Sequence, residues 1–125
     1  MQIVSPHYSP SARWQNLVFV SGQLPLPPTG PRTPSGSFAE QTRLALDNVL
    51  AVLKQAGTSR EHVLKVTAYI VGIENWDAFN SVYAEVFGPN KPARTIVPVA
   101  ELHFGCLLEV DAIACLPEQQ NDRAQ

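Results

Sequence analysis

The chain has 125 residues, of which 45% are apolar and 16% charged, and its formal net charge at pH 7 is −2. The length predicts one domain, and the apolar content suffices for a packed core and excludes a disordered chain. The slightly acidic balance argues against nucleic acid as a partner, and no apolar run approaches the roughly 20 residues of a membrane-spanning helix. Because residues 1–10 (MQIVSPHYSP) lack the basic head and long apolar stretch of a secretory signal, we expect a cytoplasmic protein.

The first half of the chain predicts a strand, a loop and a helix. Residues 16–22 (NLVFVSG) are rich in β-branched and aromatic side chains and end at a glycine, which is typical of a strand. Five prolines in residues 23–36 exclude a helix or a central strand there, so we expect a surface loop. Ser37 and Glu40 have the spacing of a capping box, and Gly57 is a natural C-terminal cap for the helix between them. The apolar positions that recur at helical intervals are Phe38, Ala45, Val49, Val52 and Ala56.

A second strand and a second helix follow. Residues 62–72 (HVLKVTAYIVG) predict a strand with two distinct faces. One face carries Leu64, Val66, Ala68 and Ile70, and the other carries Lys65, Thr67 and Tyr69. Residues 76–88 show helical spacing of their apolar side chains and end at a glycine. The apolar positions are Trp76, Phe79, Val82, Tyr83 and Val86.

Two further strands close the chain. Residues 93–100 (ARTIVPVA) predict a strand in which Pro98 removes a backbone donor, so this strand lies at a sheet edge, contains a bulge or ends there. Residues 106–116 (CLLEVDAIACL) predict the fourth strand. A disulfide between Cys106 and Cys115 on one strand is geometrically unfavourable, so we expect free thiols.

The element order predicts a two-layer α+β domain, with a mixed sheet and both helices on one of its faces. We place this domain at residues 1–117 and a polar C-terminal tail at residues 118–125. The other sheet face, which carries Lys65, Thr67 and Tyr69, is left uncovered and is mixed in character. Such a face on a small domain predicts that subunits pack against it.

Common classes of catalytic site find no support in the sequence. The histidines His7, His62 and His103 are scattered and lack metal-ligand spacing, so we expect no metal site. Residues 27–36 (PPTGPRTPSG) match neither phosphate-binding nor dinucleotide-binding patterns. Ser21 is followed by a loop rather than a helix, which argues against a nucleophile elbow.

The candidates that remain are Arg94, which opens a strand, and Glu109 and Asp111, which leave the same face of another strand. Arg94 either binds a ligand or forms an ion pair with Glu109 or Asp111 across neighbouring strands. The two acids are otherwise side chains of a solvated strand face. Tyr8 and Asn80 are polar groups that could equally be an N-terminal packing residue and a surface residue of a helix.

Five segments together resemble, in order, the blocks of the reactive intermediate deaminase family, also called Rid or YjgF-like. The resemblance covers nearly the whole chain, from about Tyr8 to Leu116. Its most specific parts are SGQ before a proline-glycine loop, FN with tyrosine three further on, PAR before a β-branched strand, and the closing EVDAIA. The segments are VFVSGQLPLPPTG (18–30), AEQTRLALDNVLAVLKQAG (39–57), VLKVTAYIVGIENWDAFNSVYAEVFG (63–88), KPARTIVPVAEL (91–102) and LLEVDAIA (107–114).

The resemblance implies a chorismate-mutase-like fold and a homotrimer, whose sheets form a central barrel with clefts between adjacent subunits. It implies hydrolysis of reactive 2-imino and enamine acids, such as 2-aminoacrylate, to 2-keto acids and ammonia, without a cofactor. Arg94 matches the arginine that binds the substrate carboxylate, and Glu109 matches the acid that positions or polarises water. The implied substrate-binding set is Tyr8 (from the neighbouring subunit), Gly22, Arg94 and Ile96, with Asn80 and Ser21 as supporting residues. For Asn80 we expect a contact with the loop before Arg94 rather than with substrate.

Several positions depart from the family pattern. Ile96 replaces a common cysteine, Pro10 replaces a common glutamine, and Trp14 adds bulk near the first strand. His103 and Phe104 stand in a segment that is usually different, so we expect them to reshape the rim of the cleft. These changes bear on the identity of the substrate more than on the reaction class.

Three functions were weighed. An imine or enamine deaminase needs both Arg94 and Glu109, whereas a non-catalytic trimer that binds small carboxylates, as a sensor or holdase, needs only the arginine. A ribonuclease, which older family names suggest, is disfavoured by the acidic isoelectric point near 5.8 and the lack of a histidine pair.

Overall fold

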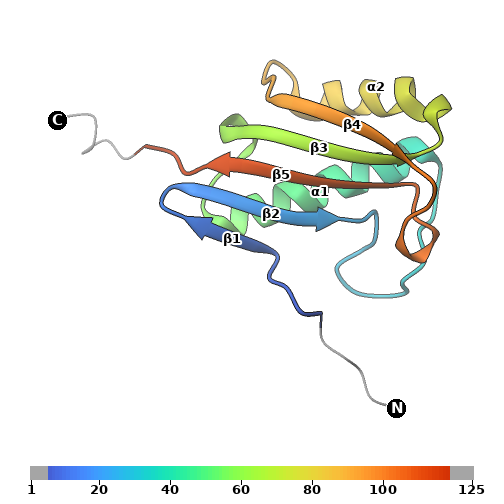
Figure 1. Ribbon diagram of the computed structural model, residues 1–125, viewed down its shortest axis with the longest axis horizontal. Coiled ribbons are helices and arrows are strands. Elements are labelled where there is room, and N and C mark those ends of the chain that lie inside the picture. Colours follow the sequence, from blue (N-terminus) through green and yellow to red (C-terminus); the bar gives the residue numbers. More distant parts are fainter. Residues whose placement is uncertain (1–5, 119–125) are drawn as a thin grey trace, which may run out of the picture.

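The computed structural model describes residues 6–118, which form one five-stranded sheet covered on one face by two helices (Figure 1). The strand order is β1-β2-β5-β3-β4, and every pair is antiparallel except β3 with β4. The predicted α+β class with a mixed sheet is therefore confirmed. The strands are β1 (Ser11–Trp14), β2 (Leu17–Gln23), β3 (Val63–Val71), β4 (Ala93–Val99) and β5 (Leu108–Cys115).

The helices are α1 (Phe38–Ala56) and α2 (Trp76–Phe87), and three short 3-10 turns, η1 (Arg60–His62), η2 (Ile73–Asn75) and η3 (His103–Gly105), complete the elements. Helix α2 connects the parallel strands β3 and β4, as a crossover between parallel strands requires. Strand β4 is an edge of the sheet, so the loss of a donor at Pro98 is tolerated there, as predicted. Neither helix of residues 6–118 is long and apolar enough to cross a membrane.

The ends of α1 are set by its sequence. The Ser37 side chain accepts a hydrogen bond from the Glu40 amide at 3.2 Å, and a Glu40 carboxylate oxygen accepts one from the Ser37 amide at 2.8 Å. These two bonds make the predicted capping box. Gly57 ends the helix with a φ of 92°, in the left-handed region that glycine adopts without strain.

Two details of the strands differ from the prediction. Strand β1 was missed, since it has only four residues and begins a hairpin whose two-residue turn includes Gln15 at a φ of 54°. In β3 the register shifts between Val63 and Lys65, so Val63 is buried and Leu64 is exposed. The prediction that Leu64 shares the inner face was therefore wrong, because a bulge reverses the alternation at that point.

The core lies between the sheet and the helices. On β5 the side chains alternate strictly, with Leu108, Val110, Ala112 and Ala114 buried toward the helices. The buried stripe of α1 is turned from the predicted one, since Leu46 and Leu53 are fully buried while Val52 and Ala56 are partly buried. Phe79 and Phe87 of α2 complete the core.

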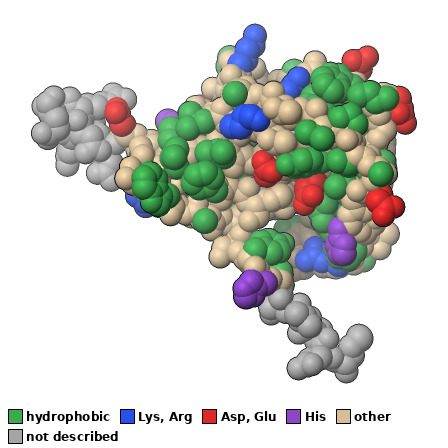
Figure 2. Space-filling view, viewed as in Figure 1, with side chains coloured by type: hydrophobic (Ala, Val, Ile, Leu, Met, Phe, Trp, Pro, Cys, Tyr) green, Lys and Arg blue, Asp and Glu red, His purple; other side chains and the backbone are tan. Residues whose placement is uncertain are grey.

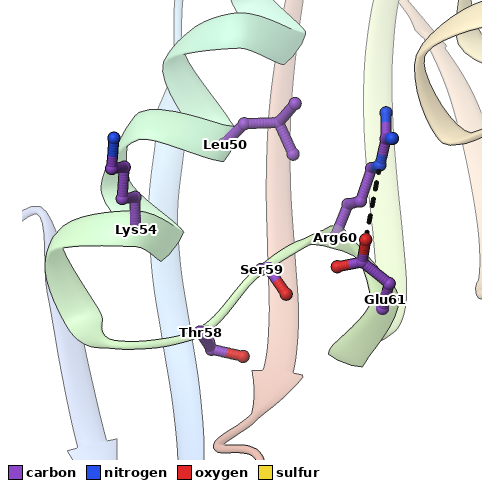
Figure 3. Close-up of a pocket in the computed structure, with 6 residues that line it drawn as sticks. All are labelled: Leu50, Lys54, Thr58, Ser59, Arg60 and Glu61. Atoms are coloured by element: carbon purple, nitrogen blue, oxygen red, sulfur yellow. Dashed lines mark ion pairs between the residues drawn. The ribbon is translucent and has the colours of Figure 1, made fainter.

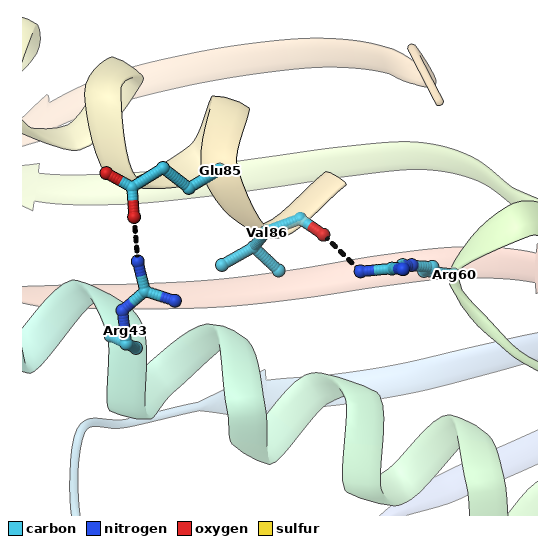
Figure 4. Close-up of polar contacts among 4 residues, drawn as sticks. All are labelled: Arg43, Arg60, Glu85 and Val86. Carbon is cyan, nitrogen blue, oxygen red and sulfur yellow. Dashed lines mark hydrogen bonds and ion pairs between the residues drawn. The ribbon is translucent and has the colours of Figure 1, made fainter. Parts of the chain in front are cut away.

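Polar contacts join the second helix to its surroundings on the outer surface (Figure 4). Arg43 of α1 forms a hydrogen-bonded ion pair with Glu85 of α2. Arg60 donates a hydrogen bond to the Val86 carbonyl near the C-terminal end of α2 at 2.7 Å. A cation at a helix C-terminus is favourable because the last carbonyls carry partial negative charge.

The sheet face opposite the helices is uncovered in the single chain, and Figure 2 shows apolar and charged side chains mixed on it. Lys65, Thr67 and Tyr69 of β3 lie on this face, together with Glu109 and Asp111 of β5. These side chains are half-buried, and the face is mixed in character, as the sequence predicted. Their intermediate exposure leaves room for a further layer to pack on them.

Candidate functional site

Arg94 is held against α2 at the edge of the sheet. Its Nη1 donates a hydrogen bond to the Asn80 side-chain oxygen at 2.9 Å. Its guanidinium carbon lies 4.7 Å from the centre of the Tyr83 ring and 6.0 Å from that of Phe79, which is cation–π geometry. Asn80 and Tyr83 can share the arginine because residues three apart on a helix lie on one face. Asn80 therefore contacts Arg94 itself, rather than the loop before it.

The ion pair that the sequence left open for Arg94 does not form. Arg94 pairs in register with the buried Val66 of β3, so its side chain lies on the helix-covered face of the sheet. Glu109 and Asp111 of β5 pair with Tyr69 and Thr67 of β3, and their side chains lie on the opposite, uncovered face of the sheet. Within residues 6–118, the recorded ion pairs join Arg43 to Glu85 and Arg60 to Glu61. The alternative of an ion pair across neighbouring strands is excluded, because β3 lies between β4 and β5.

Glu109 sits in an environment that favours its protonated form. Burial is the main cause of its raised pKa, and the nearby Asp111 carboxylate raises the pKa further, whereas His103 opposes the shift. Burial also raises the pKa of Asp111, which accepts a hydrogen bond from the Tyr69 hydroxyl at 3.4 Å. A carboxyl group whose pKa is shifted toward neutrality can both accept and return a proton, which acid–base catalysis requires.

Gly22 makes the space that the Glu109 side chain occupies. A Cβ at position 22 would lie 2.7 Å from Oε2 and 2.9 Å from Cδ of Glu109. The register shift between Val20 and Gln23 places this glycine in an irregular part of the β2–β5 pairing. The structure therefore brings Gly22 and Glu109 together in one subunit.

Ser21 fastens the segment that precedes β1. Its hydroxyl donates to the Ser9 carbonyl at 2.7 Å, and its amide donates to the Pro10 carbonyl at 2.9 Å. The neighbouring residue Tyr8 is 65% exposed in the single chain. Ser21 thus positions the stretch that carries Tyr8, which is consistent with the supporting role predicted for it.

The predicted residues therefore form two groups rather than one. Arg94, Asn80 and Ile96 belong to the helix-covered side, where Ile96 is only 9% exposed and packs in the core. Gly22 and Glu109 belong to the uncovered side. No cluster of three potential metal ligands occurs among residues 6–118.

A cavity of about 500 Å³ lies beside Arg94, lined by α2 and the loop that leads into β4. Tyr83 and Phe87, whose rings stack with centres 4.5 Å apart, contribute apolar walls. The Tyr83 hydroxyl is buried without a hydrogen-bond partner, and burial raises the pKa of this group to about 12. The sequence predicted Tyr83 as an apolar helix position and as the tyrosine three after Asn80 in the family motif, but it gave no role for Tyr83 beside Arg94.

A second cavity, of about 250 Å³, lies at the C-terminal end of α1 (Figure 3). Lys54 and Arg60 lie on opposite sides of it, and Leu50 lies between them. Arg60 is already engaged, since its Nε is 3.8 Å from Glu61 and its Nη1 binds the Val86 carbonyl. None of the predicted site residues lines this cavity, so the candidate site is the region of Arg94 and Glu109.

Several known proteins are similar to this chain over most of its length. The family described as Endoribonuclease L-PSP matches residues 2–116. A RutC family protein of Pyrococcus abyssi is 39% identical over 107 residues, which cover 86% of this chain and 84% of that protein. The human 2-iminobutanoate/2-iminopropanoate deaminase is 33% identical over 86% of this chain and 78% of its own. The crystal structure of E. coli TdcF with bound serine superposes with a TM-score of 0.83 at 33% identity and covers 92% of this chain and 91% of TdcF.

The family match covers residues 2–116, and the similar sequences and structures support it. The resemblance inferred from the five segments is thereby confirmed. The chain belongs to the Endoribonuclease L-PSP family, which is also known as the YjgF or Rid family.

Proposed function

We propose that this protein is a deaminase that hydrolyses reactive 2-imino and enamine acids to 2-keto acids and ammonia. The observation that carries the proposal is the pairing of two features: a guanidinium held in place by neutral partners, and a half-buried carboxyl with a raised pKa. The first suits a substrate carboxylate, and the second suits proton transfer at the reacting carbon. The human relative, which is named for such a deamination, supports the same reaction class.

Arg94 would bind the substrate through its carboxylate. Asn80 accepts from one guanidinium nitrogen, so the other nitrogens remain to bind a carboxylate. The ring of Tyr83 lies against the guanidinium and limits the orientations that it can adopt. Less side-chain freedom is then lost when the substrate binds, which favours affinity.

Glu109 would direct water to the imine. The carboxylate accepts a proton from the water whose oxygen forms a bond to C2, and it returns that proton to the imine nitrogen, which keeps the electron pair of the broken C=N π bond. In the resulting amino alcohol the carboxylate takes the hydroxyl proton and passes it to the nitrogen. The C–N bond then breaks, ammonia leaves with its electron pair, and the C2 oxygen becomes the keto group. One water is consumed and one ammonia is released, so the reaction needs no net oxidation or reduction.

The two groups would meet between subunits. Arg94 and Glu109 leave opposite faces of one sheet and are separated by β3, about 10 Å across two strand spacings. A single subunit therefore cannot bring both groups to one small substrate. We infer a homotrimer in which the uncovered sheet face and edge strand β4 pack against neighbours and form a central barrel with three clefts. The exposed Tyr8 would reach into a neighbour's cleft.

The alternative is a non-catalytic trimer that binds small carboxylates as a sensor or holdase. The serine bound to E. coli TdcF shows that a protein of this fold can hold a small amino acid. Such a binder needs the Arg94 group but has no use for a proton-transferring Glu109. The cytoplasmic location and the absence of a cofactor stay predictions from the sequence.

The test is direct hydrolysis of imines made in place by an amino-acid oxidase, with the keto acid measured as it forms. Wild type should speed keto-acid formation above the spontaneous rate. Glu109→Gln should bind pyruvate as wild type does, yet lose about ten- to a thousandfold in rate, because the amide cannot accept the proton. A Glu109→Gln protein as fast as wild type would favour the sensor instead.

A further inference from the structure

The cavity beside Arg94 carries positive charge that no ion pair within residues 6–118 balances. Its lining includes two cations, Arg94 and Lys91, and no acidic side chain. Neither cation forms an ion pair with another residue of the described part of the chain. Lys91 is exposed on the loop that follows α2, whereas Arg94 is half-buried at the start of β4. A concave site with two cations and no acid selects anionic ligands.

The rest of the lining is largely apolar or neutral. Tyr83 and Phe87 form stacked walls, and Pro92 adds an apolar contact between the two cations in the chain. The Asn90 side-chain nitrogen donates to the Phe87 carbonyl at 3.1 Å, and this neutral amide adds no competing charge. The cavity thus offers a cation at Arg94, an apolar wall, and a second cation at Lys91.

The volume exceeds what the smallest imines need. Sites of about 300 to 1,000 Å³ typically hold ligands much larger than a three-carbon acid, and this cavity encloses about 500 Å³. One carboxylate satisfies the planar fork of Arg94 bidentately. The Lys91 ammonium then remains for another group of the same ligand.

Resting on the proposed function, we propose that Lys91 binds a second anionic group, so that the preferred substrates are imino acids with an acidic side chain. Arg94 holds the carboxylate next to the imine, and the substrate chain runs along Tyr83 and Phe87 toward Lys91. The preferred class is therefore the 2-imino dicarboxylates. Lys91 is a specificity-determining residue in this arrangement, and it takes no part in proton transfer.

The test compares two five-carbon imines that differ only at the far end: 2-iminoglutarate, made from glutamate, and 2-iminopentanoate, made from norvaline. Both are generated in place by oxidases that accept the parent amino acid. The proteins are wild type, Lys91→Met, Lys91→Arg and the matched control Lys54→Met, which removes the same charge from the other cavity (Figure 3). Binding of 2-oxoglutarate and 2-oxopentanoate is measured in parallel by calorimetry.

Wild type should favour the diacid, and Lys91→Met should lower kcat/KM for the diacid about two- to fivefold while the ratio for the monoacid stays near one. Lys91→Arg should restore the preference, Lys54→Met should keep it, and added salt should weaken it. Equal effects of Lys91→Met on both substrates, or no effect on either, would overturn the proposal.

The binding measurements separate this proposal from the proposed function. If neither imine is hydrolysed but 2-oxoglutarate still binds more tightly than 2-oxopentanoate in a Lys91-dependent way, the deaminase assignment fails and the anion subsite stands. If imines are hydrolysed with no preference and no dependence on Lys91, the deaminase stands and the subsite fails.

Discussion

Replacement of Gly22 by alanine tests whether the position of Glu109 matters for the reaction. The added Cβ would lie 2.7 Å from Oε2, whereas ordinary contacts begin at 3.4 Å, so the carboxylate must move by about 0.7 Å (3.4 − 2.7) to reach an ordinary contact. The backbone itself accepts alanine, because Gly22 is not among the residues with positive φ. The end of the Glu109 side chain can rotate away, so the strain falls on its position rather than on the fold.

The expected result is a stable but slow enzyme. Gly→Ala at a compatible backbone position stabilises a protein by about 0.4–1 kcal/mol, since the unfolded chain loses freedom. A misplacement of about 1 Å can reduce a rate about a hundredfold, so keto-acid formation should fall by about ten- to a hundredfold. Thermal melts and imine hydrolysis on the same preparations measure both quantities.

The control is the same change in a Glu109→Gln background. If Gly22 acts only through Glu109, alanine should cost nothing further there, because the two effects are not additive. A Gly22→Ala protein that hydrolyses imines at the wild-type rate would refute the reasoning. A melt far below wild type would show that the displaced side chain disrupts the sheet instead.

Three further predictions concern the arginine, the pH dependence and the assembly. Arg94→Ala should lose carboxylate binding but only about 1 kcal/mol of stability, for the lost contacts to Asn80 and Tyr83; a loss of roughly 3 to 5 kcal/mol in thermal melts would indicate a buried ion pair instead. Arg94→Lys should bind pyruvate poorly with a nearly unchanged melt, because lysine lacks the planar fork. Glu109 has a folded-state pKa above its ordinary 4.5, so the stability linked to its proton is present below that value and lost as pH rises through the raised pKa. Glu109→Gln should therefore gain stability relative to wild type in melts as pH rises above 4.5 and through the raised pKa, and an unchanged difference would argue against the raised pKa. Light scattering should give the mass of a trimer at micromolar concentration, and a stable monomer would remove the clefts between subunits.

Local signals in the sequence predicted the local structure well. The capping box at Ser37, the glycine after α1 and the proline in edge strand β4 each act within a few residues, and the structure has all three. Strand β1 escaped because four residues ending in the exposed Trp14 show little of the apolar pattern that marks a strand. Leu64 was misplaced because a bulge depends on the pairing partner, which the sequence of one strand does not reveal.

The sequence named candidate site residues, but it did not predict their arrangement in the sheet. The sequence left open an ion pair between Arg94 and Glu109 because strand order is set by long-range pairing, and β3 proved to lie between their strands. The role of Tyr83 was missed because an apolar helical stripe predicts core packing and says nothing of a cation above the ring. Lys91 carried no signal at all until the cavity beside it was known.

The central claim, that Arg94 and Glu109 act on one substrate from different subunits, has a direct test by mixing subunits. Arg94→Ala and Glu109→Gln chains are coexpressed and purified together, and imine hydrolysis is compared with that of each variant alone. If each site takes its arginine from one subunit and its acid from the next, random mixing should regenerate about a quarter of the wild-type sites (½ × ½), because both groups are intact at that fraction of clefts. The account predicts recovery to about a quarter of wild-type activity from two nearly inactive parents. A mixture no more active than its parents, although light scattering and mass spectrometry show mixed trimers, would contradict it.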